Sequence, residues 1–127
     1  MAHEIINTPD APAAIGPYSQ AVKAGNTVYL SGCIALEPET GLVIDGDVTA
    51  QARRAFLNFE AICKAAGGSL KDVVKLGLFV TDLDDFAAVN AVMSEFFEQP
   101  YPARSTVEVS ALPRGVMFEV DGILVLE

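Results

Sequence analysis

The fold is decided by residues 47–80, DVTAQARRAFLNFEAICKAAGGSLKDVVKLGLFV. Apolar residues recur there at spacings of three and four, at Ala52, Ala55, Phe56, Phe59, Ile62, Cys63 and Ala66. This pattern predicts one amphipathic helix, capped by Asp47 or Thr49 and stopped near Ala66 by Gly67-Gly68. The residues that close the stretch, Val73–Val80, predict a long apolar strand.

The segment before this stretch predicts a strand and a loop. Residues 27–34, TVYLSGCI, are rich in β-branched and aromatic side chains and follow the turn pair Gly25-Asn26, which is typical of a strand. Residues 37–46 contain a proline and two glycines, and this predicts a loop or a turn with short strands.

A second helix and two strands are predicted after it. Asp82 or Asp84 is the expected cap, and residues 99–102, QPYP, end the helix because proline cannot continue it. Its apolar side is formed by Phe86, Val89, Met93, Phe96 and Phe97. Residues 105–110 and 116–126 predict two final strands, joined as a hairpin by a turn at 112–115.

This order predicts an α+β fold for a single domain spanning residues 1–127. The two helices are expected to cover one face of a mixed sheet. The other face needs a cover as well, because strands as apolar as 73–80 and 116–126 are rarely left open to water. We therefore expect a homo-oligomer in which a partner subunit covers that face.

Composition excludes several classes of protein. The chain has 17 acidic and 8 basic residues, a net charge of −9, which argues against nucleic-acid binding. No apolar run approaches the roughly 20 residues of a membrane span, and the first residues lack the pattern of a signal peptide, so a cytoplasmic location is expected. With two cysteines, no CxxC pair and His3 as the only histidine, neither a disulfide nor a metal site is expected.

Some polar residues interrupt the pattern and have two interpretations each. Asn90 falls on or beside the apolar side of the second helix, where its amide either bonds a nearby loop or lines a pocket. Arg104 opens a strand and is either a surface arginine or a clamp for a carboxylate, which its planar fork fits. Tyr18 follows Gly16-Pro17 and is either an anchoring aromatic or a pocket residue.

The last strand and the first long strand offer further candidates. Glu119 and Asp121 alternate with apolar residues, so both carboxylates lie on one face, which is either solvated or part of an interface pocket where a carboxylate could activate water. Ser31-Gly32, inside a strand, indicates close approach of backbone or ligand.

Four segments together resemble the RidA (YjgF/YER057c/UK114) family. They are AIGPYSQA at 14–21, VYLSG at 28–32, FVTDL at 79–83 with Phe86 and Val89-Asn90, and PARSTVEV at 102–109 with Leu112-Pro113. The resemblance covers nearly the whole chain in order. It implies a chorismate-mutase-like fold and a homotrimer in which the sheets form a central barrel, with three ligand pockets in the clefts between subunits.

The resemblance also implies an activity and a site. The family's substrates are 2-aminoacrylate-type enamines and 2-imino acids, released by pyridoxal-phosphate dehydratases that form no stable complex with the deaminase. They are hydrolysed to 2-keto acids and ammonia without metal or cofactor. Motif matching implies two catalytic residues: Arg104 at the position that binds the substrate carboxylate, and Glu119 at the position that orients the attacking water. The substrate-binding residues are then Tyr18, Ser31, Gly32, Asn90, Arg104 and Thr106.

Two departures and three other functions stay open. Thr106 stands where many active relatives have cysteine, and the segment between Phe97 and Pro102 is short, which bears on substrate range near the pocket mouth. The alternatives are a regulatory trimer that binds 2-keto acids without turnover, an endoribonuclease or translation inhibitor, and a chaperone-like protein. The acidic charge speaks against the ribonuclease.

Overall fold

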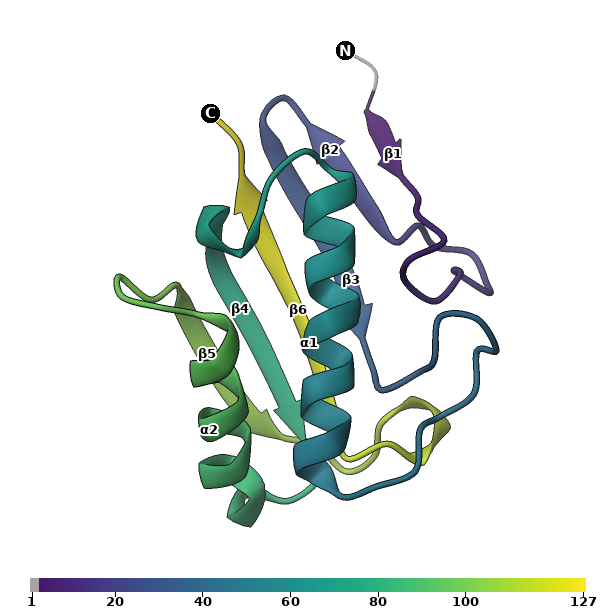
Figure 1. The fold of residues 1–127 in the computed structure, drawn as a ribbon, viewed down its shortest axis with the longest axis vertical. Coiled ribbons are helices and arrows are strands. Elements are labelled where there is room, and N and C mark those ends of the chain that lie inside the picture. Colours follow the sequence, from purple (N-terminus) through teal and green to yellow (C-terminus); the bar gives the residue numbers. More distant parts are fainter. Residues whose placement is uncertain (1–2) are drawn as a thin grey trace.

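A computed structural model describes residues 3–127 of the chain. Within them, one sheet has six strands in the order β1-β2-β3-β6-β4-β5, and helices α1 and α2 lie side by side on one of its faces (Figure 1). The bounds are β1 Glu4–Ile6, β2 Ala21–Ala24, β3 Thr27–Cys33, α1 Val48–Ala65, β4 Val73–Val80, α2 Phe86–Phe96, β5 Ala103–Glu108 and β6 Phe118–Val125. The predicted α+β class and the placement of both helices on one face are confirmed.

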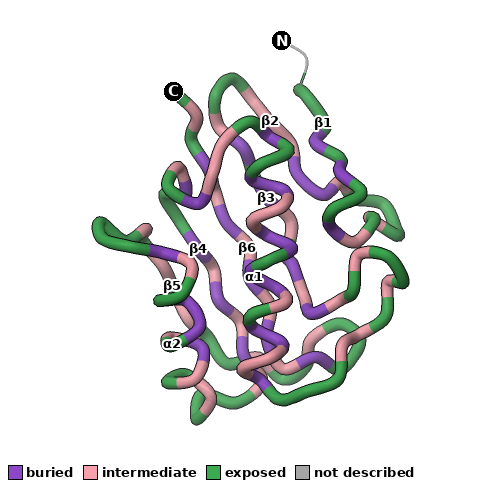
Figure 2. Tube along the Cα trace, viewed as in Figure 1, coloured by how far each residue is buried: buried purple, intermediate pink, exposed green. Residues whose placement is uncertain are grey.

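Helix α1 follows the predicted pattern at both ends. The Asp47 side chain accepts a hydrogen bond from the Ala50 backbone N–H at 3.0 Å, a normal N-cap. After the helix Gly67 takes φ +96°, a left-handed conformation that glycine adopts at low cost. The predicted apolar stripe is buried, and Figure 2 shows buried and exposed positions alternating along the helix.

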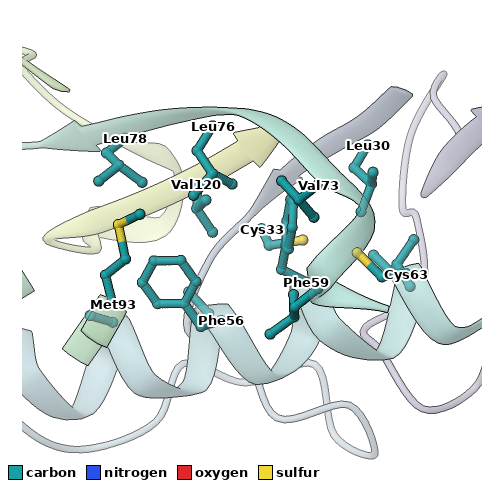
Figure 3. Packing of buried hydrophobic residues seen from close by; sticks show 14 of the residues in the cluster. Leu30, Cys33, Phe56, Phe59, Cys63, Val73, Leu76, Leu78, Met93 and Val120 are labelled. Carbon is teal, nitrogen blue, oxygen red and sulfur yellow. The ribbon is translucent and has the colours of Figure 1, made fainter. Parts of the chain in front are cut away.

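The core lies between the helices and the sheet. Phe56 of α1 is fully buried, and its ring lies 5.4 Å from that of Phe118 on β6 and 5.5 Å from that of Phe96 on α2. Such ring pairs add to the stabilisation from burial. Figure 3 shows Phe56, Phe59 and Met93 directed from the helices toward side chains of the sheet.

The predicted hairpin of the last two strands is wrong. Strand β6 lies between β3 and β4, antiparallel to both, while β5 runs parallel to β4 at the sheet edge. The physical reason lies in burial: β6 buries Phe118, Val120 and Leu124, whereas no residue of β5 is fully buried. The more apolar strand therefore takes the central position, and the chain crosses over between the two.

The N-terminal strands β1 and β2 were not predicted, since each is too short to show a period. The start of the second helix also differs from expectation. Asp82 caps a short 3₁₀ turn, Leu83–Asp85, and α2 begins at Phe86. Among residues 3–127 no helix is long and apolar enough to cross a membrane.

Candidate functional site

A pocket of about 540 Å³ lies at the end of β3, between the N-terminal segment and the turn that precedes β6. Four of the predicted site residues line it, namely Tyr18, Ser31, Gly32 and Glu119. Tyr18 is 54% exposed, so its ring forms part of the pocket wall and does not anchor the core. The pocket is open to solvent and has a carboxylate in its lining.

A β-bulge sets the position of that carboxylate. Between the pairs Leu30–Gly122 and Cys33–Val120, strand β3 has two residues and β6 has only Asp121. At the bulge Gly32 lies against Glu119: a β-carbon added at position 32 would come within 2.7 Å of Glu119 Cδ and still closer to Oε2. Glycine at this position thus lets the Glu119 side chain approach the backbone closely, whereas the sequence indicated a close approach of backbone or ligand.

Glu119 and Asp121 lie on the face of the sheet that neither helix covers. Burial raises the pKa of Glu119 above its ordinary value, and the neighbouring charge of Asp121 adds to this. Burial also raises the pKa of Asp121, although the Gly77 backbone N–H partly offsets it. A carboxylate with a raised pKa is a stronger base toward water than an ordinary glutamate.

Two buried amides that were not predicted hold the pocket walls. The Gln20 side chain accepts from the Thr8 backbone N–H at 2.8 Å and donates to the Pro12 carbonyl at 2.9 Å. Asn58 donates to the carbonyls of Ile34 and Leu36 at 3.0 and 2.9 Å. A polar residue within the apolar stripe of α1 was the signal that could have identified Asn58, because a buried amide needs partners.

Ser31 has a structural bond in this structure. Its hydroxyl donates to the Ser19 carbonyl at 2.6 Å and so fixes the backbone next to Tyr18. Cys33 also lines the pocket, and burial raises the pKa of its thiol far above the ordinary value. The pKa of Cys63 is raised to about 12, again mainly by burial. Both thiols are protonated at neutral pH, so neither is an activated nucleophile.

Arg104 lies outside this pocket, on β5 beneath α2. Its Nη1 donates to Asn90 Oδ1 at 2.5 Å and contacts the sulfur of Met93 at 3.3 Å. Its guanidinium carbon lies 5.1 Å from the centre of the Phe86 ring, a cation–π contact. Within residues 3–127 both side-chain hydrogen bonds of Arg104 start from Nη1, so Nε and Nη2 have no partner there. The Asn90 side chain thus bonds the Arg104 side chain and not the backbone of a neighbouring loop.

Thr106 lies two residues further along β5, on the same side of the strand as Arg104. Its hydroxyl oxygen is buried, and among residues 3–127 it is the buried side-chain N or O atom without a hydrogen-bond partner. A buried hydroxyl left unpaired costs about 1–3 kcal/mol. The Arg104 and Thr106 side chains together therefore offer unpaired donors close to each other.

The predicted site residues form two groups on opposite faces of the sheet. On β5, Arg104 pairs with Leu76 and Thr106 with Leu78, and both leucines are buried beneath the helices. Glu119 pairs with Phe79 of β4, which points to the other face. Arg104, Asn90 and Thr106 thus belong to the helix side, whereas Tyr18, Ser31, Gly32 and Glu119 meet at the pocket.

Two further expectations concern the segment before β5 and the binding of metal ions. The segment 97–102 lines a separate depression together with residues 69–73 and shares no lining residue with the Glu119 pocket. Among the described residues, no three His, Cys, Asp or Glu side chains are grouped so that they could hold a metal ion.

Comparison with known proteins identifies the class. The model of the family described as Endoribonuclease L-PSP matches residues 8–126. A protein of the mite Dermatophagoides farinae, named 2-iminobutanoate/2-iminopropanoate deaminase, is 49% identical over 97% of this chain and 96% of its own. The goat (Capra hircus) protein of the same name is 42% identical over 98% of this chain and 91% of its own.

Solved structures agree with this. RidA from the Antarctic bacterium Psychrobacter sp. PAMC 21119 has a TM-score of 0.94 and 52% identity, with 97% of this chain and 99% of the other covered. E. coli TdcF with bound serine has a TM-score of 0.92 and 45% identity, with 98% and 99% covered. The chain belongs to the RidA family, as its four sequence motifs predicted.

Proposed function

We propose that this protein is a 2-imino acid deaminase that acts as a homotrimer, with each active site built from two copies of the chain. The observation that carries the proposal is the separation of Arg104 from Glu119 by the sheet. A clamp and a base that serve one substrate must lie on the same side of it. Arg104 of one copy therefore completes the Glu119 pocket of the next.

The uncovered face of the sheet supports the assembly. Tyr29, Val107 and Val125 on that face are 53%, 44% and 37% exposed, although they are large and apolar. A second copy would remove this surface from water, at roughly 25 cal/mol per Å² of apolar area buried. Packing of three such faces would give the central barrel that the family resemblance implies, in a closed symmetric oligomer.

Substrate binding follows from the free donors. The Nε and Nη2 groups of Arg104 can hold the carboxylate of a 2-imino acid in two parallel hydrogen bonds, while Asn90 holds Nη1. This grip fixes the imine carbon, which is bonded directly to the carboxylate carbon, opposite the neighbour's Glu119. Fixing the reacting carbon converts a bimolecular attack by water into an oriented one.

The reaction is hydrolysis of a C=N bond. Glu119 takes a proton from a water molecule while the water oxygen bonds to the carbon of the protonated imine. The product is a carbinolamine. Glu119 then gives this proton to the amine nitrogen and takes the proton of the new hydroxyl group, so the C–N bond breaks, ammonia leaves and the C=O bond of the 2-keto acid forms. General base catalysis contributes typically 10²–10⁴-fold, which suffices for an electrophile as reactive as an imine. We propose that no metal or cofactor takes part.

The proposal includes a source for the substrate. We expect the imines to come from pyridoxal-phosphate dehydratases in the cytoplasm, without a stable complex between the enzymes.

Some relatives are named for a ribonuclease activity and not for imine hydrolysis. The family model is described as Endoribonuclease L-PSP, and a 47% identical Thermotoga maritima protein of known structure is called a putative endoribonuclease. The net charge of −9 opposes an RNA-binding role here, since phosphate contacts need basic residues.

Mixing two inactive variants tests the shared site. Arg104→Ala and Glu119→Gln chains, each nearly inactive alone, are refolded together in equal amounts and assayed for imine hydrolysis. A site that needs Arg104 from one copy and Glu119 from its neighbour regains about one quarter of wild-type activity on random assembly. No recovery in mixed oligomers would contradict a site shared between copies. Binding of 2-keto acids without any hydrolysis by wild type would favour the regulatory alternative.

A further inference from the structure

A second arginine, Arg114, lines the Glu119 pocket and has no part in the proposed chemistry. It lies in the turn Pro113–Gly115 that leads into β6, and its φ is +61°. In the described chain it is the residue other than glycine with a positive φ. Such a backbone is costly for a residue with a β-carbon, and strain of this kind persists mainly at ligand-binding and catalytic positions.

The side chain of Arg114 bonds the backbone of another loop. Its Nη1 donates to the Gly41 carbonyl at 3.3 Å, and the side chain remains exposed. Within residues 3–127 the one ion pair joins Arg53 to Glu95, so the charge of Arg114 is not neutralised by a carboxylate. In a chain of net charge −9, an arginine in the pocket lining whose charge has no carboxylate partner favours an anionic ligand there.

We infer that Arg114 binds a second carboxylate of the substrate, so that the preferred substrates are 2-imino acids with an acidic side chain. This inference rests on the proposed function. The carboxylate next to the imine goes to Arg104 of the neighbouring copy, and the side chain of the substrate extends into the pocket beneath Arg114. In the single chain this pocket has a volume of about 540 Å³, within the usual range for small-molecule sites.

A purely structural role for Arg114, bridging two loops, makes a different prediction. Loss of the bridge would disturb the pocket for every substrate, whatever its charge. Loss of a carboxylate contact would instead reduce turnover of the acidic substrate far more than that of an uncharged one. The ratio of the two kcat/KM values therefore separates the two roles.

The test uses 2-iminoglutarate and 2-iminobutanoate, each generated in situ by an amino-acid oxidase, with keto-acid formation measured above the spontaneous rate. We expect the ratio of kcat/KM for the acidic over the uncharged substrate to fall roughly 10- to 100-fold in Arg114→Met, the range for a hydrogen bond between charged groups. Arg114→Lys should retain most of the ratio. The matched control Arg53→Met removes the same charge from the paired, exposed position on α1 and should leave the ratio unchanged.

An unchanged ratio in Arg114→Met would overturn the inference while the proposed function stands. If wild type accelerates neither substrate, the proposed function fails, and the inference is decided by binding alone. Titration with 2-oxoglutarate and 2-oxobutanoate then supports it if the dicarboxylate binds more tightly to wild type and loses that advantage in Arg114→Met. Equal binding of the two keto acids would refute it.

Discussion

The carboxylate of Glu119 occupies the space directly over Gly32, where any other residue would place its β-carbon. The contact joins two strands at a β-bulge in which two residues of β3 face the single residue Asp121 of β6. The bulge places a partly buried acid against the backbone of Gly32 in the pocket lining. Glycine at this position thus leaves room for the Glu119 side chain, whereas a turn is the commoner reason for a glycine.

Gly32→Ala should therefore displace the Glu119 side chain without disrupting the fold. The clash falls on the end of a flexible side chain, so we expect unfolding to become easier by only about 1 kcal/mol. Deaminase activity should fall about 10²-fold, as it would on loss of the base. In a double-mutant cycle with Glu119→Gln, the second substitution should add almost nothing. Full additivity would show that Gly32 acts independently of Glu119.

Asn90 orients Arg104, and its removal should weaken substrate binding. Asn90→Ala deletes the acceptor for Nη1, a hydrogen bond to a charged group worth about 1.5–3 kcal/mol. We expect KM to rise about tenfold, with a smaller effect on kcat. Ser94→Ala on the same helix is the control, since within residues 3–127 its hydroxyl bonds the Asn90 backbone carbonyl and no side chain. Equal effects of the two variants would assign the loss to the helix and not to Arg104.

Thr106 offers an unpaired hydroxyl beside Arg104, and this predicts opposite effects on stability and binding. Thr106→Val keeps the shape of the side chain and removes the unpaired group, so the free energy of unfolding should rise by about 1 kcal/mol. If the hydroxyl donates to the substrate carboxylate, KM should rise several-fold, and Thr106→Ser should restore it. A Val variant that is less stable and has an unchanged KM would mean that the hydroxyl is paired within the assembly.

The raised pKa of Glu119 predicts a pH-dependent cost to stability. The folded protein holds the proton of this carboxyl more tightly than the unfolded chain, mainly because of burial. Ionisation of Glu119 therefore destabilises the folded protein relative to the unfolded chain. The stabilisation from its protonated form is complete below the unfolded pKa and is lost as pH rises through the folded pKa. Glu119→Gln should be more stable than wild type at pH 7.5 and equal to it near pH 3.5, as measured by urea unfolding. Lower stability of the Gln variant at pH 7.5 would contradict this.

Local sequence pattern predicted those elements whose burial is periodic. The stripe through Phe56 and Phe59 defined α1, and the apolar run Val73–Val80 defined β4 with the bounds that the structure has. Strand pairing could not be read in this way. The hairpin prediction failed because strands that are neighbours in sequence need not pair. Strand β6 lies inside the sheet, paired with β3 and β4, which are distant from it in sequence.

The candidate site residues were predicted one at a time. Their separation into two groups on opposite faces of the sheet was not predicted. Period-two alternation placed Glu119 on one face of its strand, and motif resemblance pointed to Arg104. Their opposite faces depend on the parallel register of β5 with β4, which pairs Arg104 with the buried Leu76. No pattern within either strand contains that information. The roles of Gln20 and Asn58 depend likewise on loop backbone that only the fold brings within reach.

The central claim, that Arg104 holds the carboxylate of a 2-imino acid during hydrolysis, is tested most directly by one comparison. A threonine dehydratase supplies 2-aminocrotonate and its imine in situ, and keto-acid and ammonia release are followed with wild type, Arg104→Ala and the control Arg53→Ala. We expect wild type and Arg53→Ala to accelerate hydrolysis equally, and Arg104→Ala to show only the spontaneous rate while its oligomer stays intact. Wild-type activity in a folded Arg104→Ala variant would contradict the account.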